Sequence, residues 1–327
     1  MRAAYYERKG TAQDVLILGD VPVPDPGPDE VLVRVAISGV NPTDTKARSG
    51  WRSSPMAFPR VIPHQDGAGV IQKVGSNISE SRIGERVWLY EAQWQRPHGT
   101  AAEFTTVRSR QAVTLPENVS FHEGACLGIP AMTAHRCVFA DEAVNGQRIL
   151  VAGGAGAVGF YAIQFAKLGG AFVITTVSSA RDADTAVRAG ADIVIDRKKE
   201  DVAKRVLEIT ENKGVDRIIE VAFGENAYLD AAIIAENGKI AAYASDAEHD
   251  PRLPFYGFMM KNTVLHFVLV YRMSEQAHQA AADEIGKCLR TNSLKHLLPA
   301  EFGLNDIVLA HTALESGTIR GKVVVTI

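Results

Sequence analysis

The chain has 327 residues, of which 46% are apolar and 22% are charged, and its formal net charge is −3. This length corresponds to about two domains, and the composition excludes a disordered, collagen-like or coiled-coil chain. The weakly negative charge offers no attraction for nucleic acid or for an anionic membrane, so we expect neither partner.

The cysteine pattern and the N-terminus indicate the compartment. Cys126, Cys137 and Cys288 are too few and too widely spaced for a disulfide framework or a CxxC zinc clip, and they fit a reducing compartment. Residues 1–9 lack the apolar core of a signal peptide. The uncharged run 149–166 contains clustered glycines, which favour a strand turning into a helix over a membrane span. We therefore expect a cytoplasmic protein.

The first third of the chain is predicted to be rich in β-strands. Residues 31–37, 69–74 and 85–89 alternate apolar and polar side chains well enough to form strands. Prolines crowd residues 22–28, which are predicted to form a loop. Short strands and turns with little helix are expected here.

From Arg148 onward, apolar β-branched runs alternate with helical stretches, which is typical of βαβ units. The predicted strands are 149–152, 172–177, 192–195, 217–221, 239–243 and 263–270, and the predicted helices are 157–168, 182–189, 202–211 and 227–235. This pattern matches a doubly wound dinucleotide-binding fold. Residues 307–327 are predicted to form a helix and then a strand.

These patterns predict an α/β protein with two domains. The β-rich domain comprises residues 1–126, and the doubly wound parallel-sheet domain comprises residues 127–270. Residues 271–327 are expected to return to the first domain, so that the nucleotide-binding domain is an insertion.

The strongest motif is Gly154-x-Gly156-x-x-Gly159, which follows a predicted strand and opens a predicted helix. In this context the glycines allow a tight turn, the approach of a diphosphate and close packing of helix against strand. The free N–H groups of the helix N-terminus then bind the diphosphate. We assign Gly154, Ala155, Gly156, Ala157, Val158 and Gly159 to cofactor binding. The alternative is an ordinary glycine-rich turn.

The tip of the second predicted strand bears on the choice of cofactor. No acid stands there to hold a ribose 2′-hydroxyl; Ser178, Ser179 and Arg181 follow instead. Hydroxyls and an arginine suit a 2′-phosphate and hence NADP(H). Arg197 follows the third strand and could reach the same phosphate, and Arg320 could contribute if the tail folds back. Asp182, beside Arg181, weakens the case for a 2′-phosphate site. Both Arg181 and Arg197 could instead be solvated surface charges.

Several segments together resemble one known family. They are 39–44 (GVNPTD), 48–50 (RSG), 66–70 (DGAGV), 74–75 (VG), 128–134 (GIPAMTA), the glycine loop and 321–324 (GKVV). In this order they resemble zeta-crystallin-type quinone oxidoreductases of the medium-chain dehydrogenase/reductase superfamily. The resemblance implies a GroES-like β-rich catalytic domain, a Rossmann domain, NADPH as cofactor and a homodimer joined through Rossmann edge strands.

The resemblance also allows a comparison with zinc-dependent alcohol dehydrogenases. Asn41 stands where those enzymes have a cysteine ligand, and Gln65 stands where they have a histidine. His64 lies one residue away and is expected to be structural. Zinc needs three or four N, S or O ligands, which this chain does not assemble, so we expect no metal.

Two departures from the family concern the substrate site. Lys46 replaces a tyrosine that family members often carry over the nicotinamide, and an aromatic residue expected near Arg52 is displaced to Trp51. Tyr90 and Trp94 could replace the missing aromatics beside a flat substrate. His98, Cys126 and His135 are expected to be structural.

The resulting hypothesis is NADPH-dependent reduction of a quinone by hydride transfer without zinc. The expected catalytic residues are Asn41, Asp44, Lys46, Arg52 and Tyr90; Thr133, Tyr243, Phe267, Val268 and Leu269 are expected to bind the cofactor at its nicotinamide end. The partner would be a small flat conjugated acceptor. One alternative is an NADPH-dependent enone or alkenal reductase; the other is a non-catalytic NADPH-binding or crystallin-like protein.

Overall fold

The computed structural model describes residues 1–140, 142–317, 319 and 321–327. The chain forms two compact units, residues 1–129 with 282–327, and residues 130–281. The boundaries expected from the sequence were 126/127 and 270/271. The observed divisions fall inside helices α4 (Gly128–Phe139) and α10 (Glu275–Arg290), which continue from one unit into the other and carry no turn that a sequence would mark.

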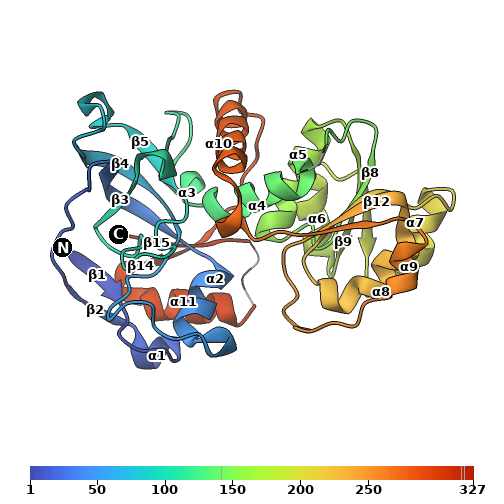
Figure 1. Cartoon of the computed structure of the whole chain (residues 1–327), viewed down its shortest axis with the longest axis horizontal. Helices are drawn as coiled ribbons and strands as arrows, with labels where there is room; N and C mark the ends of the chain where they lie inside the picture. Colours follow the sequence, from blue (N-terminus) through green and yellow to red (C-terminus); the bar gives the residue numbers. More distant parts are fainter. Residues whose placement is uncertain (141, 318, 320) are drawn as a thin grey trace. The chain divides into compact units, whose positions relative to one another are not determined.

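The first unit is built on a mostly antiparallel sheet in the order β14-β15-β3-β4-β5-β7, with β6 paired to β3 (Figure 1). Its strands are β1 (Arg2–Tyr5), β2 (Ile17–Asp20), β3 (Glu30–Val40), β4 (Asp66–Val74), β5 (Arg86–Leu89), β6 (Phe104–Arg108), β7 (Ala112–Thr114), β14 (Ala300–Gly303) and β15 (Val323–Thr326). Strand β15 lies antiparallel to β3, so the end of the chain completes this sheet. Residues 22–28 form a loop, as predicted.

Helices in the first unit are more prominent than the sequence suggested. Figure 1 shows α1 (Ala12–Val15), α2 (Pro42–Ser49) and α11 (Ile307–Glu315) side by side, and each contacts the other two. A further short helix, α3 (Phe121–Gly124), precedes α4. Helix α2 begins at Pro42, whose fixed φ suits a first helical position, and ends before Gly50 in the left-handed conformation (φ +83°). It was missed because its residues are mostly polar and carry no strong apolar period.

The second unit is a parallel sheet in the order β10-β9-β8-β11-β12-β13 (Figure 1). Its strands are β8 (Arg148–Val151), β9 (Phe172–Val177), β10 (Ile193–Asp196), β11 (Val215–Glu220), β12 (Ile234–Ala242) and β13 (Val264–Phe267). Its helices are α5 (Ala157–Leu168), α6 (Ala180–Ala189), α7 (Val202–Ile209), α8 (Phe223–Ile233) and α9 (Phe255–Met259). The predicted doubly wound fold is confirmed, and the strand order reverses between β8 and β11, where such folds bind nucleotides.

In the second unit, two strand boundaries differ from the prediction by more than two residues. Strand β12 begins at Ile234 rather than at residue 239, and β13 ends at Phe267 rather than at residue 270. Val270 lies in a single 3₁₀ turn, so the apolar run continues past the end of the sheet. An apolar run alone does not mark where pairing stops. No helix among the described residues is long and apolar enough to cross a membrane.

Candidate active site

The glycine loop joins β8 to α5 and is tied to the tip of β9. Gly153 adopts a positive φ of +69°, and its N–H donates to the Thr176 hydroxyl at 3.2 Å. A Cβ on Gly154 would lie 2.1 Å from Thr175 Oγ1, and one on Gly159 would lie 2.3 Å from the Gly153 carbonyl oxygen. These two glycines are therefore required by the packing of strand, loop and helix.

Gly156 differs from its neighbours. It is exposed, and the nearest atom to a Cβ built there is the Gly153 carbonyl oxygen at 3.3 Å. The fold thus has room for a small side chain at Gly156, immediately before the free N–H groups of the first turn of α5. A glycine there keeps the backbone open to a ligand, which is the property that diphosphate binding needs. The loop fits a dinucleotide.

The residues expected at the cofactor's 2′-position gather beside this loop. The Arg197 N–H donates to the Val177 carbonyl oxygen at 3.0 Å, which holds the end of β10 beside Ser178. Arg181 and Arg197 are exposed. The Ser179 hydroxyl caps α6 by accepting from the Asp182 N–H. Arg320 lies outside the described residues.

Asp182 argues against phosphate binding by Ser178. Its carboxylate accepts from the Ser178 hydroxyl at 3.3 Å, and the residue is buried beneath the first turn of α6. A carboxylate in this position competes with a phosphate for the Ser178 hydroxyl. The two exposed arginines are therefore the stronger candidates for a 2′-phosphate.

The residues expected at the nicotinamide end lie mostly at the same carboxyl edge of the sheet. Tyr243 follows β12 and donates its N–H to the Glu220 carbonyl oxygen, and the Val268 N–H donates to the Ala242 carbonyl oxygen. Burial raises the pKa of the Tyr243 hydroxyl well above its ordinary value. Phe267 and Leu269 are exposed, whereas Val268 is buried. Thr133 is buried on α4.

In the first unit, Asn41 is held in a buried polar cluster. Its amide nitrogen donates to Asp66 Oδ2 at 2.8 Å, and its amide oxygen accepts from Lys322 Nζ at 2.5 Å. The Lys322 ammonium also donates to Asp66 Oδ2 at 2.6 Å, and Asp66 Oδ1 accepts from the Ile129 N–H at 2.9 Å. These side chains are almost completely buried. An amide, a carboxylate and an ammonium thus bond one another in a nearly solvent-free environment.

Lys322 and Asp66 were not predicted as site residues, although both lie within the family motifs of the sequence. Strand register brings them together, because Gly39 lies opposite Asp66 across β3 and β4 while Val40 lies opposite Val323 across β3 and β15. The signal was a lysine directly before a strongly apolar strand, where a charge must find a partner.

Asp44 lies next to this cluster. Its Oδ2 accepts from the Asn41 N–H at 2.7 Å, and the residue is buried, with an exposed fraction of 2%. Burial raises the pKa of Asp44 to about 8, although the Asn41 N–H partly offsets the shift. A carboxyl group in this state holds a proton near neutral pH.

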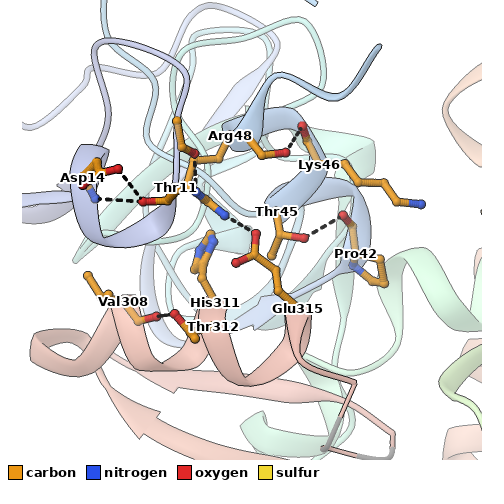
Figure 2. Close-up of polar contacts among 12 residues, drawn as sticks. Thr11, Asp14, Pro42, Thr45, Lys46, Arg48, Val308, His311, Thr312 and Glu315 are labelled. Carbon is orange, nitrogen blue, oxygen red and sulfur yellow. Dashed lines mark hydrogen bonds and ion pairs between the residues drawn. The ribbon is translucent and has the colours of Figure 1, made fainter. Parts of the chain in front are cut away.

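Lys46 and Arg52 meet on one aromatic ring. Lys46 Nζ lies 5.3 Å from the centroid of the Trp51 ring, and the Arg52 guanidinium carbon lies 5.6 Å from it. Figure 2 shows the Lys46 side chain pointing away from the ion pair between Arg48 and Glu315. Trp51 itself is exposed, so the three side chains form a cationic, aromatic surface beside α2.

Tyr90, which is expected beside a flat substrate, packs against a second aromatic ring. It is 3% exposed, as is Asn41, and its ring centroid lies 5.9 Å from that of Trp88. The backbone turns directly after it at Glu91, which has a positive φ of +53°. Trp94 is half-buried.

The side chains at and beside the positions where alcohol dehydrogenases carry zinc ligands form hydrogen bonds with other protein groups. Gln65 donates to Gln93 Oε1 at 3.0 Å, and His64 bonds Ser38 through Nδ1 and His311 through Nε2. Both nitrogens of His64 are therefore engaged, as expected for a structural histidine. Across the described residues, no three His, Cys, Asp or Glu side chains form a metal-binding group.

The other residues expected to be structural lie in packed surroundings. Cys126 is buried, which raises the pKa of its thiol to about 12, and the His135 ring lies 5.0 Å from Phe139. His98 is half-buried, and burial lowers the pKa of its imidazole.

Comparisons with known proteins agree with this fold. The family model described as "Alcohol dehydrogenase GroES-like domain" matches residues 27–117, and the one described as "Zinc-binding dehydrogenase" matches residues 157–286. The quinone oxidoreductase of Rattus norvegicus is 30% identical over 99% of this chain and 97% of its own, and that of Homo sapiens is 28% identical over the same shares.

Solved structures give the same result. A quinone oxidoreductase from Pseudomonas syringae pv. tomato DC3000 is 28% identical with a TM-score of 0.89, covering 100% of this chain and 99% of that one. A mycobacterial protein complexed with NADPH is 26% identical with a TM-score of 0.88, and both chains are covered completely. Fold and domain content define an oxidoreductase of the medium-chain dehydrogenase/reductase class. Within that class, the chain belongs to the quinone oxidoreductase family.

Proposed function

We propose that this protein reduces quinones by hydride transfer from NADPH without a metal ion. The observation that carries the proposal is the glycine loop, in which Gly154 and Gly159 are required by packing while Gly156 leaves the backbone open at the start of α5. Relatives named quinone oxidoreductase and a neighbour complexed with NADPH support it.

NADPH, when bound, supplies the hydride. The loop and the first turn of α5 hold the diphosphate through backbone N–H groups, and Arg181 and Arg197 bind the 2′-phosphate. Tyr243, Phe267, Val268 and Leu269 orient the nicotinamide end, to which we also assign Thr133. Accurate positioning contributes much of the rate in such reactions, because both reactants are held before transfer.

The acceptor is assigned to the surface around Asn41. Hydride transfer places negative charge on the acceptor oxygen, which the Asn41 amide, Lys46 and Arg52 stabilise in place of a metal. We also assign Asp44 to this site, since its burial keeps a proton available near neutral pH. The side chains of Asn41 and Gln65 are already bonded to protein groups, which supports zinc-free chemistry.

The test is NADPH consumption by the purified protein against a panel of acceptors. We expect turnover with 1,4-benzoquinone and 1,4-naphthoquinone, and slower or no turnover with simple ketones. Faster turnover with enones or alkenals would make the protein an enone reductase. Tight NADPH binding without oxidation by any acceptor would make it a binding protein.

We further propose that the protein is a homodimer joined along β13. This strand ends the sheet and, among the described residues, pairs only with β12. Exposed apolar side chains gather on it and on α9, namely Val264, Phe255, Tyr256, Met259 and Met260. Exposed apolar edges of this kind pair with another chain unless they are covered. Light scattering of wild type and Val264→Glu tests this; we expect a dimer and a monomer respectively.

The three described cysteines are unpaired and buried, which supports a reducing compartment, and we assign the protein to the cytoplasm. Fractionation of the source cells tests this assignment.

A further inference from the structure

Lys322 has no role in the function proposed above, although its ammonium is buried against the amide of Asn41. The exposed fraction of the residue is 3%, and the ammonium has two partners, Asn41 Oδ1 and Asp66 Oδ2. Burying such an ion pair contributes little net stability, because desolvation offsets most of the attraction. The arrangement needs another explanation.

The cluster lies at the start of α2. Asn41 occupies the N-cap of this helix, and Asp44 accepts from the Asn41 N–H as part of a capping box. The Asn41 side chain also bonds Lys322 and Asp66, so the cluster and the start of the helix share this residue.

Two glycines make room for the buried charges. A Cβ on Gly39 would lie 3.1 Å from Lys322 Cε and 2.2 Å from the Ala125 carbonyl oxygen. A Cβ on Gly128 would lie 2.2 Å from Asp66 Oδ1, the atom that accepts from the first turn of α4. The backbone is therefore shaped around the carboxylate and the lysine stem.

The hydrogen bonds of Asn41 use its amide oxygen and its amide nitrogen. Its amide oxygen accepts from Lys322, and one amide hydrogen goes to Asp66 Oδ2. Among the described residues, Asp66 is the partner that this amide nitrogen bonds. An ammonium bound to an amide oxygen draws electron density from the nitrogen, so the second amide hydrogen becomes a stronger donor.

We propose that Lys322 is a positioning residue that fixes and polarises the Asn41 amide, whose remaining N–H binds the acceptor oxygen as it becomes negative. This inference rests on the proposed quinone reduction. The hydride pair passes from the nicotinamide to the acceptor, the charge accumulates on the acceptor oxygen, and a proton from solvent later neutralises it. Lys322 gives up no proton in this step.

The test compares Asp66→Asn/Lys322→Met with wild type, because removing both charges leaves no uncompensated buried ion. With saturating NADPH and quinone, we expect kcat to fall about tenfold or more, as when one donor to a developing oxyanion is weakened. The KM for NADPH should not change. Asp192→Asn/Lys167→Met removes a partly exposed ion pair of 2.8 Å in the other unit and should leave kcat unchanged.

A double-mutant cycle with Asn41→Ala distinguishes a positioning role of Lys322 from a structural one. Asn41→Ala alone should lower kcat at least as much, and adding Asp66→Asn/Lys322→Met should lower it no further. A structural ion pair would instead lower the melting temperature and leave kcat unchanged, or reduce kcat equally in both backgrounds. Either result overturns the inference.

If Asp66→Asn/Lys322→Met does not fold, Lys322→Arg replaces it in the same cycle. We then expect an effect on kcat with Asn41 present and none with Asn41→Ala; equal effects contradict the proposal. A wild-type protein that oxidises no NADPH with any quinone contradicts the proposed function itself. Active wild type with an unchanged double variant contradicts only the role of Lys322.

Discussion

Arg48 on α2 and Glu315 on α11 form an ion pair although 267 positions separate them in the chain (Figure 2). Arg48 is 1% exposed, and its guanidinium also donates to the Gly10 carbonyl oxygen. This pair ties the helix that begins after Asn41 to the C-terminal helix. The candidate site in the first unit therefore depends on residues from both ends of the chain.

Removing the carboxylate should loosen this connection. We expect Glu315→Ala to lower the free energy of unfolding by about 1–3 kcal/mol, the range for leaving a buried donor, here Arg48, without its partner. Urea denaturation measures the change. Thr312→Ala removes an exposed hydroxyl that bonds only the Val308 carbonyl oxygen of the same helix, and it should cost about 0.5 kcal/mol or less. Equal losses for the two variants would contradict the importance of the pair.

The glycine loop offers a matched pair of substitutions. The Cβ that Gly156→Ala adds would lie 3.3 Å from the Gly153 carbonyl oxygen, so we expect no change in the melting temperature. The KM for NADPH should rise. Gly159→Ala forces a Cβ to within 2.3 Å of the same oxygen, so the protein itself should be destabilised. Thermal denaturation and initial-rate kinetics distinguish the two. A Gly156→Ala variant with unchanged KM would show that no ligand approaches this residue.

The two exposed arginines should determine the preference for NADPH over NADH. A charge-assisted hydrogen bond contributes about 1.5–3 kcal/mol, so Arg181→Ala or Arg197→Ala should lower kcat/KM for NADPH about tenfold or more. The value for NADH should not change, since NADH lacks the 2′-phosphate. Arg188→Ala, near the other end of α6, serves as the control. If NADH already works as well as NADPH in wild type, the interpretation of this strand tip is wrong.

We expect two buried carboxyl groups in the nucleotide-binding unit, those of Glu220 and Asp230, to share a proton. Glu220 accepts hydrogen bonds from the Ala222 N–H and the Asn226 amide, whereas neither oxygen of Asp230 has a donor among the described residues. Glu220 is therefore the ionised partner, and Asp230 holds the proton. Burial raises the pKa of Asp230 to about 9, and the neighbouring Glu220 adds to the shift.

The raised pKa of Asp230 determines how the stability of the protein changes with pH. The ordinary pKa of an aspartate is 3.8, so the folded state retains a proton that the unfolded chain releases above that value. The stability from this group is complete below pH 3.8 and is lost as the pH rises toward about 9. We expect the melting temperature to fall between pH 7 and pH 9 in wild type and to fall less in Asp230→Asn. Parallel curves for both proteins would contradict the shared proton, and Asp184→Asn, an exposed residue, is the control.

The nucleotide-binding unit could be predicted well because its signals are local. Helix α5 begins and ends where the sequence analysis placed it, since the glycine run and the following apolar helix are contiguous. The Asn41, Asp66 and Lys322 cluster could not be predicted, because it depends on the register among β3, β4 and β15. The burial of Tyr90 could not be predicted either, because an aromatic residue just after a strand can face the core or solvent.

The most direct measurement of zinc-free quinone reduction is turnover with NADPH and 1,4-benzoquinone before and after chelator treatment, with metal content determined on the same sample. Asn41 and Gln65 bond protein groups, so we predict substoichiometric zinc and an unchanged rate after chelation. Stoichiometric zinc whose removal abolishes turnover, and whose return restores it, would contradict the proposed mechanism.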